Sequence, residues 1–122
     1  MDKNKSFAHH LIRSFEDAFR GLAFVWKEER NFRIQIYIAL LVIVGGIWLR
    51  FDYIEMALLI FAILLVLIAE VINTAFEDTM NKIEPNQDPL VGKVKDIAAG
   101  IAVLSALGSL VIGAIIFIHH FL

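Results

Sequence analysis

The chain has 122 residues, of which 59% are hydrophobic, and its formal net charge is only −2. Its mean hydropathy of +0.73 is typical of a protein that lies in a lipid bilayer. The absence of cysteine excludes disulfides and thiolate metal sites, and the nearly balanced charge gives no indication of nucleic-acid binding.

Residues 1–33 are predicted to form an amphipathic helix that lies on the membrane surface. Apolar side chains recur at intervals of three and four residues, as at Leu11, Phe15 and Leu22, and charged side chains take the opposite side. Taken alone, such a helix could be a simple membrane anchor. It ends, however, in the charged segment K-E-E-R-N-F-R, where we expect Glu29 at the depth of the lipid headgroups.

Three apolar stretches follow, and they predict transmembrane helices over residues 34–50, 54–78 and 96–119, the second with a cytoplasmic extension. The whole chain, residues 1–122, is therefore expected to be one all-α integral-membrane domain. Pro85 and Pro89 are expected to prevent any helix from crossing residues 82–92. Seven Lys and Arg residues precede the first span and three lie between the second and third. The positive-inside rule then places the N-terminus in the cytoplasm and the C-terminus outside the cell membrane.

The second span carries acidic and amide side chains at helical spacing, on one face: Glu70, Asn73, Thr74, Glu77 and Asn81. An ionisable group within a span costs about 2.5–3.5 kcal/mol on insertion scales, so an intramembrane acid is a candidate functional residue. A polar seam between helices is the alternative, although Asn and Thr alone could provide it. Two carboxylates on one face repel each other unless a cation or a proton lies between them, which favours a functional site.

Glu29 and Glu77 are expected to meet at the same membrane depth. Carboxylates from two elements suit a hard divalent cation such as Mg²⁺, which prefers oxygen ligands. The alternative for the segment around Glu29 is a solvated cap with internal ion pairs.

Lys95 and Asp96 stand at the predicted start of the third span, beside the acidic face. A lysine in this place is usually an anchor that reaches to the membrane surface, but here its ammonium could hold a phosphate. Farther along, a seam of small residues predicts close helix packing within the chain or between subunits: Ala98, Ala102, Ala106, Ser109 and Gly113. No phosphate-binding loop of the soluble kinases occurs in the sequence.

The segments E-V-I-N-T-A-F-E-D-T (70–79) and K-x-K-D-I-A-A-G-x-A-V-L (93–104) resemble the prokaryotic diacylglycerol kinase and undecaprenol kinase family of small membrane kinases. The resemblance extends upstream to Gly21-Leu22, Trp26, the E-x-x-F-R motif of Glu29 and Trp48-Leu49. It implies phosphoryl transfer from ATP, with Mg²⁺, to a lipid hydroxyl at the cytoplasmic interface. The family fold has one surface helix and three transmembrane helices in a homotrimeric bundle, with active sites shared between subunits.

The resemblance also implies roles for individual residues. Glu70 would be the general base and contact the lipid substrate, and Glu29 and Glu77 would bind the metal that bridges the ATP phosphates. Asn73, Lys95 and Asp96 would complete the nucleotide site, and Arg33 and Trp48 would lie along the lipid groove.

Several positions depart from the family pattern. His10 and Asp17 stand where diacylglycerol kinases carry an Arg and a Tyr for the nucleotide, Gln35 replaces an acid, and Asp88 replaces a histidine of many undecaprenol kinases. Ala99 lies within A-A-G, as in the undecaprenol kinases, where diacylglycerol-specific members have Gly-Ser. This favours undecaprenol as the substrate, with diacylglycerol as the alternative.

A non-enzymatic alternative is a holin-like pore subunit. A pore would need polar residues through the whole bilayer, whereas here the third span and most of the first lack them. The polar side chains gather instead at one depth, as expected for a site at the membrane surface.

Overall fold

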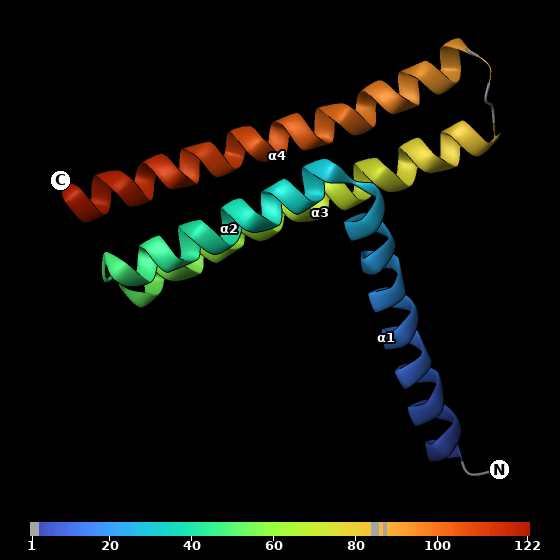
Figure 1. The fold of residues 1–122 in the computed structure, drawn as a ribbon, viewed down its shortest axis with the longest axis horizontal. Coiled ribbons are helices and arrows are strands. Elements are labelled where there is room, and N and C mark those ends of the chain that lie inside the picture. Colours follow the sequence, from blue (N-terminus) through green and yellow to red (C-terminus); the bar gives the residue numbers. More distant parts are fainter. Residues whose placement is uncertain (1–2, 84–85, 87) are drawn as a thin grey trace.

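The computed structural model describes residues 3–83, 86 and 88–122. These residues form four helices: α1 (Lys3–Glu28), α2 (Arg30–Trp48), α3 (Tyr53–Ile83) and α4 (Pro89–Phe121). In Figure 1, α2, α3 and α4 run alongside one another, and α1 leaves them at a steep angle. The C-terminus lies at the same end of the bundle as the turn between α2 and α3 (Figure 1).

Three of the helices, α2, α3 and α4, are long and apolar enough to cross a membrane. Large apolar side chains remain exposed along them, among them Leu41 and Leu104, each 72% exposed. An apolar surface of this extent is unfavourable in water and is suited to contact with lipid. The prediction of an all-α membrane protein with three spanning helices is therefore confirmed.

The boundary between α1 and α2 differs from the predicted helix over residues 1–33. The backbone at Glu29 is extended, with φ −107° and ψ 106°, so α1 ends at Glu28 and residues 30–33 belong to the first spanning helix. The guanidinium of Arg33 donates hydrogen bonds to the carbonyl oxygens of Trp26 at 2.6 Å and Lys27 at 2.9 Å. These carbonyls belong to the last turn of α1 and lack helical partners, so Arg33 stabilises the break.

Helices α3 and α4 are separate, as expected, but each extends farther into residues 82–92 than the predicted spans of 54–78 and 96–119. Helix α3 continues to Ile83, and α4 begins at Pro89 instead of residue 96. Asp88 caps α4, because its carboxylate accepts a hydrogen bond from the N–H of Leu90 at 2.7 Å. Proline is well suited to the first helical position, where its missing N–H has no partner to lose. Pro85 lies outside the described residues.

Helix α3 is central, since it packs most extensively against α4 and also contacts α2 and α1. Gly46 permits the approach of α2 to α3: a Cβ atom there would lie 3.0 Å from the ring of Phe51 and 3.1 Å from Met56. On α4, Ala98 is only 1% exposed, and the hydroxyl of Ser109 donates to the carbonyl of Ala62 at 2.9 Å.

The seam of small residues on α4 is therefore only partly a contact within the chain. Ala98 and Ser109 face α3, whereas Ala106 and Gly113 are exposed. The exposed part of the seam stays a predicted surface for contact between subunits.

The turn between α2 and α3 is tight and is closed by backbone hydrogen bonds. The N–H of Phe51 donates to Gly46 at 2.9 Å and the N–H of Arg50 donates to Ile47 at 3.1 Å, which is the Schellman pattern of helix C-termini. Arg50 has φ 60°, a conformation that glycine adopts more easily. The turn brings Asp52 to the start of α3.

Candidate active site

Glu70 lies at the interface between α2 and α3, where it is 7% exposed. The side-chain amide of Gln35, from α2, donates to a carboxylate oxygen of Glu70 at 3.5 Å. That distance is at the weak limit of a hydrogen bond. A nearly buried carboxylate therefore has one weak neutral partner within the described part of the chain and no ion pair there.

Unsatisfied polar atoms occur on Gln35, which contacts Glu70, and on residues within about one helical turn of Glu70 in α3. Within the described residues, Gln35 Oε1, Asn73 Oδ1 and Thr74 Oγ1 are buried and have no hydrogen-bond partner. Leaving a buried polar atom unpaired costs about 1–3 kcal/mol, and such groups in a native fold usually await a ligand or water. Thr74 also lines a cavity of about 290 Å³ between α1 and α3, together with Glu28 and Asp78.

Glu29 lies at the break between α1 and α2, partly buried, and its side chain makes no capping hydrogen bond. Burial raises the pKa of its carboxyl above the ordinary value, and the nearby carboxylates of Glu77, Asp78 and Glu70 raise it further. Negative charges from two elements thus gather around one partly buried position. This arrangement favours a cation, which would relieve the repulsion.

Lys95 lies close to the C-terminal end of α3. Its ammonium donates a hydrogen bond to the side-chain oxygen of Asn81, which ties the beginning of α4 to the end of α3. Asp96 is exposed beside it. The bundle therefore has a lysine available at the end where Glu77 and Asn81 emerge.

Other residues that were predicted for the site lie farther away or have structural contacts. Asp17 forms an exposed ion pair with Arg20 at 3.1 Å on α1, and His10 is exposed on the same helix. Arg33 is engaged with the end of α1. Trp48 is 81% exposed at the far end of α2, about 27 Å from Arg30 at 1.5 Å per residue. Ala99 is exposed on α4, next to buried Ala98.

Two contributions were not part of the predicted site. In the sequence Gln35 is only a departure from a family pattern, yet its amide donates a hydrogen bond to Glu70. Asp78 adds a third charge near Glu29 and Glu77. The position of Asp78 directly after Glu77 is the sequence signal that indicates a charge near Glu29.

These features define a class of protein. A buried acid and several unpaired polar atoms lie within an apolar bundle, and a cluster of carboxylates and a lysine lie toward one end of it. The arrangement suits a polytopic membrane enzyme that brings a metal-bound anionic substrate to a lipid.

Comparison with known proteins agrees with this class. Residues 16–117 match the family described as prokaryotic diacylglycerol kinase, and the chain belongs to that family. It is 28% identical over 121 residues to the diacylglycerol kinase of Escherichia coli strain K12, with 99% of each chain covered. It is 32% identical over 110 residues to the undecaprenol kinase of Bacillus subtilis strain 168, and the match covers 90% of this chain and 89% of that kinase.

The chain is thus a lipid kinase, an ATP-dependent phosphotransferase that spans the plasma membrane several times. Lipid kinases use ATP together with a divalent metal ion. The predicted family membership and enzyme class are confirmed, and the pore alternative is set aside.

Proposed function

We propose that the chain transfers the γ-phosphoryl group of ATP to the hydroxyl of undecaprenol at the cytoplasmic face of the membrane. The observation that carries this proposal is the nearly buried carboxylate of Glu70, which accepts one weak hydrogen bond from Gln35 and lies within about one helical turn of the unpaired polar atoms of Asn73 and Thr74. A polar pocket at that depth suits the hydroxyl of a lipid whose chain lies among the helices.

Glu70 acts as the general base. One of its carboxylate oxygens takes the proton of the lipid hydroxyl as the hydroxyl oxygen bonds to the γ-phosphorus, and the bond from that phosphorus to the β–γ bridging oxygen breaks to release ADP. Gln35 orients the carboxylate. The apolar helices around Glu70 exclude water, which would otherwise compete with the lipid hydroxyl.

Glu29 and Glu77 are proposed to hold Mg²⁺ with the nucleotide. The donor set fits this ion, because both groups are carboxylates, the side chain of Glu29 is not used as a helix cap, and within the described residues neither Glu29 nor Glu77 forms an ion pair. When bound, Mg²⁺ supplies charge neutralisation of the ATP phosphates. Asn73, Lys95 and Asp96 complete the nucleotide site, with Asp17 and His10 on α1 as candidate outer contacts.

The lipid is proposed to lie along α2, between Arg33 and the exposed ring of Trp48 at the opposite end. Arg33 and Trp48 are separated by about 22 Å along this helix, which is most of the thickness of the hydrocarbon core, about 30 Å. The N-terminus is proposed to be cytoplasmic and the C-terminus external, following the distribution of Lys and Arg.

The working unit is proposed to be a homotrimer with shared sites. In a single chain Glu77 and Asn81 are exposed, and the part of the α4 seam formed by Ala106 and Gly113 is also exposed. A neighbouring subunit packed there would cover both regions.

The choice of lipid is tested by measuring kcat/KM with undecaprenol and with dioleoylglycerol in mixed detergent micelles containing MgATP. We expect undecaprenol to be preferred at least about tenfold, and Ala99→Ser, at an exposed position, to narrow the preference. Preference for dioleoylglycerol would instead identify a diacylglycerol kinase. Failure to phosphorylate either lipid would contradict transfer to a lipid alcohol of this kind.

A further inference from the structure

A second polar cluster lies at the opposite end of the bundle from Glu29 and Glu77, at the start of α3. Its centre is Glu55, whose side chain is only 5% exposed. The N–H of Asp52 donates to Glu55 Oε1 at 3.0 Å, and the N–H of Glu55 donates to Asp52 Oδ1 at 2.8 Å. This reciprocal pair is a capping box, and it fixes the position of the Glu55 carboxylate.

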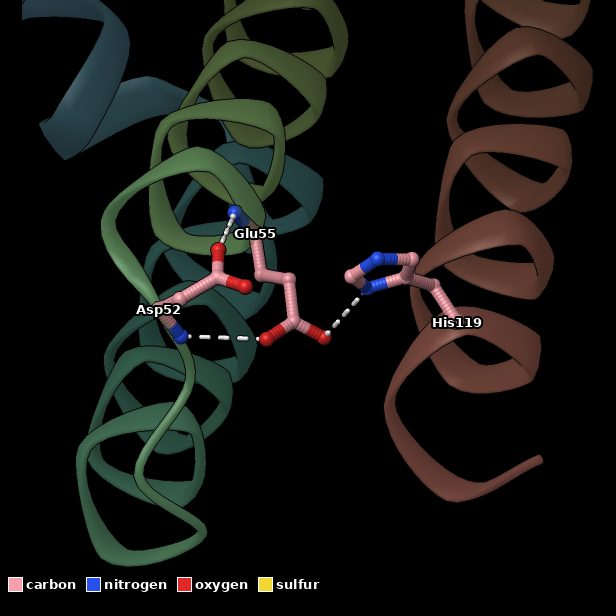
Figure 2. Close-up of side chains that lie close together, drawn as sticks. All are labelled: Asp52, Glu55 and His119. Carbon is pink, nitrogen blue, oxygen red and sulfur yellow. Dashed lines mark hydrogen bonds and ion pairs between the residues drawn. The ribbon is translucent and has the colours of Figure 1, made fainter.

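The C-terminal turn of α4 brings two histidines to the same carboxylate. Nδ1 of His119 lies 3.4 Å from Glu55 Oε2, and Nδ1 of His120 lies 3.1 Å from both carboxylate oxygens. Figure 2 shows Asp52, Glu55 and His119 converging from the α2–α3 turn, α3 and α4. Two imidazoles that converge on one buried carboxylate are more than a helix cap requires.

The two histidines differ in their surroundings. The side chain of His120 is 21% exposed, and its ring packs edge-on against Phe51 and Phe121 with ring centroids 4.8 Å apart in each pair. The side chain of His119 is 69% exposed. His120 is therefore held in place as a partner of Glu55, whereas the ring of His119 is free to turn toward a ligand.

The ligating atoms of Asp52, Glu55 and His119 all lie within 4.8 Å of one another. A tetrahedral Zn²⁺ with bonds of about 2.0–2.1 Å separates its ligand atoms by about 3.3 Å. The distance of 3.4 Å between His119 Nδ1 and Glu55 Oε2 is close to that separation. Since Asp52 uses Oδ1 for the cap, its second oxygen is the one that can turn toward an ion.

A small cavity adjoins these residues. It has a volume of about 120 Å³, lies between α3 and α4, and is lined by Glu55 and His119 with Ile54, Leu58, Ile115 and Ile116. A water molecule occupies about 30 Å³ in the liquid, so the cavity has room for an ion and a bound water. Three protein ligands and one water complete a tetrahedral coordination shell.

We propose that Asp52, Glu55 and His119 form a binding site for a transition-metal dication of the Zn²⁺ class, with His120 as the residue that orients Glu55. The ligand types distinguish it from the site for Mg²⁺, because an imidazole nitrogen suits zinc and its neighbours whereas Mg²⁺ selects oxygen ligands. The bound ion joins the end of α4 to the α2–α3 turn. It stabilises the folded bundle because the unfolded chain does not hold these ligands together.

The test is a titration of purified, chelator-treated protein in detergent with Zn²⁺ alone, followed by calorimetry and by metal analysis of the desalted sample. The protein used for the titration is the double variant Glu29→Gln/Glu77→Gln, so that zinc bound by the kinase site does not contribute. We expect one Zn²⁺ per chain, no comparable binding of Mg²⁺, and an unfolding midpoint that rises by at least about 5 °C at saturation.

Three substitutions in this background distinguish a metal site from a set of hydrogen bonds. His119→Ala should weaken zinc binding at least about tenfold, and His120→Phe, which keeps the ring packing, should weaken it in the range of about 10–100-fold. His9→Ala, at an exposed histidine of α1, is the matched control and should leave the affinity unchanged. Less than one zinc per chain, or equal affinity in His119→Ala and the control, would overturn the proposal. His119 is largely exposed, so its removal leaves the fold intact.

Discussion

Replacing Glu70 with glutamine separates the chemical role of this side chain from its structural role. Glutamine keeps the size and the acceptor oxygen, but it cannot take a proton from the lipid hydroxyl. General-base catalysis is worth a factor of about 10²–10⁴. At 1.36 kcal/mol per tenfold change in rate, Glu70→Gln should raise the barrier by about 2.7–5.4 kcal/mol.

The structural effect of the same substitution should be much smaller. Glu70 is 7% exposed, and its one hydrogen bond within the described residues, from Gln35, is 3.5 Å long. A hydrogen bond contributes about 0.5–1.5 kcal/mol, and the amide oxygen of the variant can still accept this one. Removing a buried charge that has no cationic partner there also relieves a desolvation cost. The unfolding midpoint should therefore stay the same or rise.

The assay is transfer of labelled γ-phosphate from MgATP to lipid in mixed micelles, with thermal unfolding measured on the same preparation. Glu16→Gln, at an exposed position of α1, is the matched control and should keep full activity. The reasoning is refuted if Glu70→Gln retains more than a tenth of the wild-type turnover. It is equally refuted if the lost activity is accompanied by a matching loss of stability.

Three further predictions concern the carboxylates near α1. Glu29→Gln and Glu77→Gln should each raise the Mg²⁺ concentration that gives half-maximal rate. In the double variant the fold increase should be much smaller than the product of the two single increases. An increase equal to that product would mean that the two residues share no ion. Because the folded-state pKa of Glu29 is raised by burial and by Glu77, Asp78 and Glu70, its contribution to stability is present below the ordinary value of 4.5 and lost as the pH rises through the raised pKa. With a chelator present, the unfolding midpoint of the wild type should fall as the pH rises through the raised pKa of Glu29. The Asp78→Asn variant should show a smaller fall. Identical pH profiles for the wild type and this variant would contradict an interaction between Asp78 and Glu29. Finally, mixing inactive Glu29→Ala and Glu70→Ala subunits should partly restore activity if a trimer shares its sites, whereas no recovery despite demonstrated subunit exchange would place each site in one chain.

The membrane architecture could be predicted from the sequence because lipid imposes a strong rule. A spanning segment must satisfy its backbone internally and present apolar side chains, so hydropathy alone located all three spans. The ends of the helices were harder. Pro89 indicates that no helix crosses residues 82–92, but it does not by itself indicate that α4 begins at this proline with Asp88 as its cap. Proline both interrupts a helix and suits its first turn, so the sequence alone does not fix the residue at which α4 begins.

The residues of the candidate site that share one helix face were predictable from their spacing, whereas specific contacts between helices mostly were not. The acidic face of α3 is visible in the spacing of Glu70 and Glu77, but the contact from Gln35 joins residues 35 positions apart. The cluster around Glu55 is a stronger case. Its histidine partners lie 64 and 65 positions away, and no local pattern links them.

The proposed roles of Glu29 and Glu77 as metal ligands and of Glu70 as general base are tested most directly by measuring nucleotide binding without turnover. Mn²⁺ can replace Mg²⁺ as a paramagnetic probe, and its binding with a non-hydrolysable ATP analogue is measured by electron paramagnetic resonance. Glu29→Gln and Glu77→Gln should each weaken this binding at least about tenfold. Glu70→Gln should leave the affinity within a factor of about three, because this residue acts on the lipid hydroxyl. Equal weakening by all three substitutions, or none by Glu29→Gln and Glu77→Gln, would contradict the assignment of base and metal ligands.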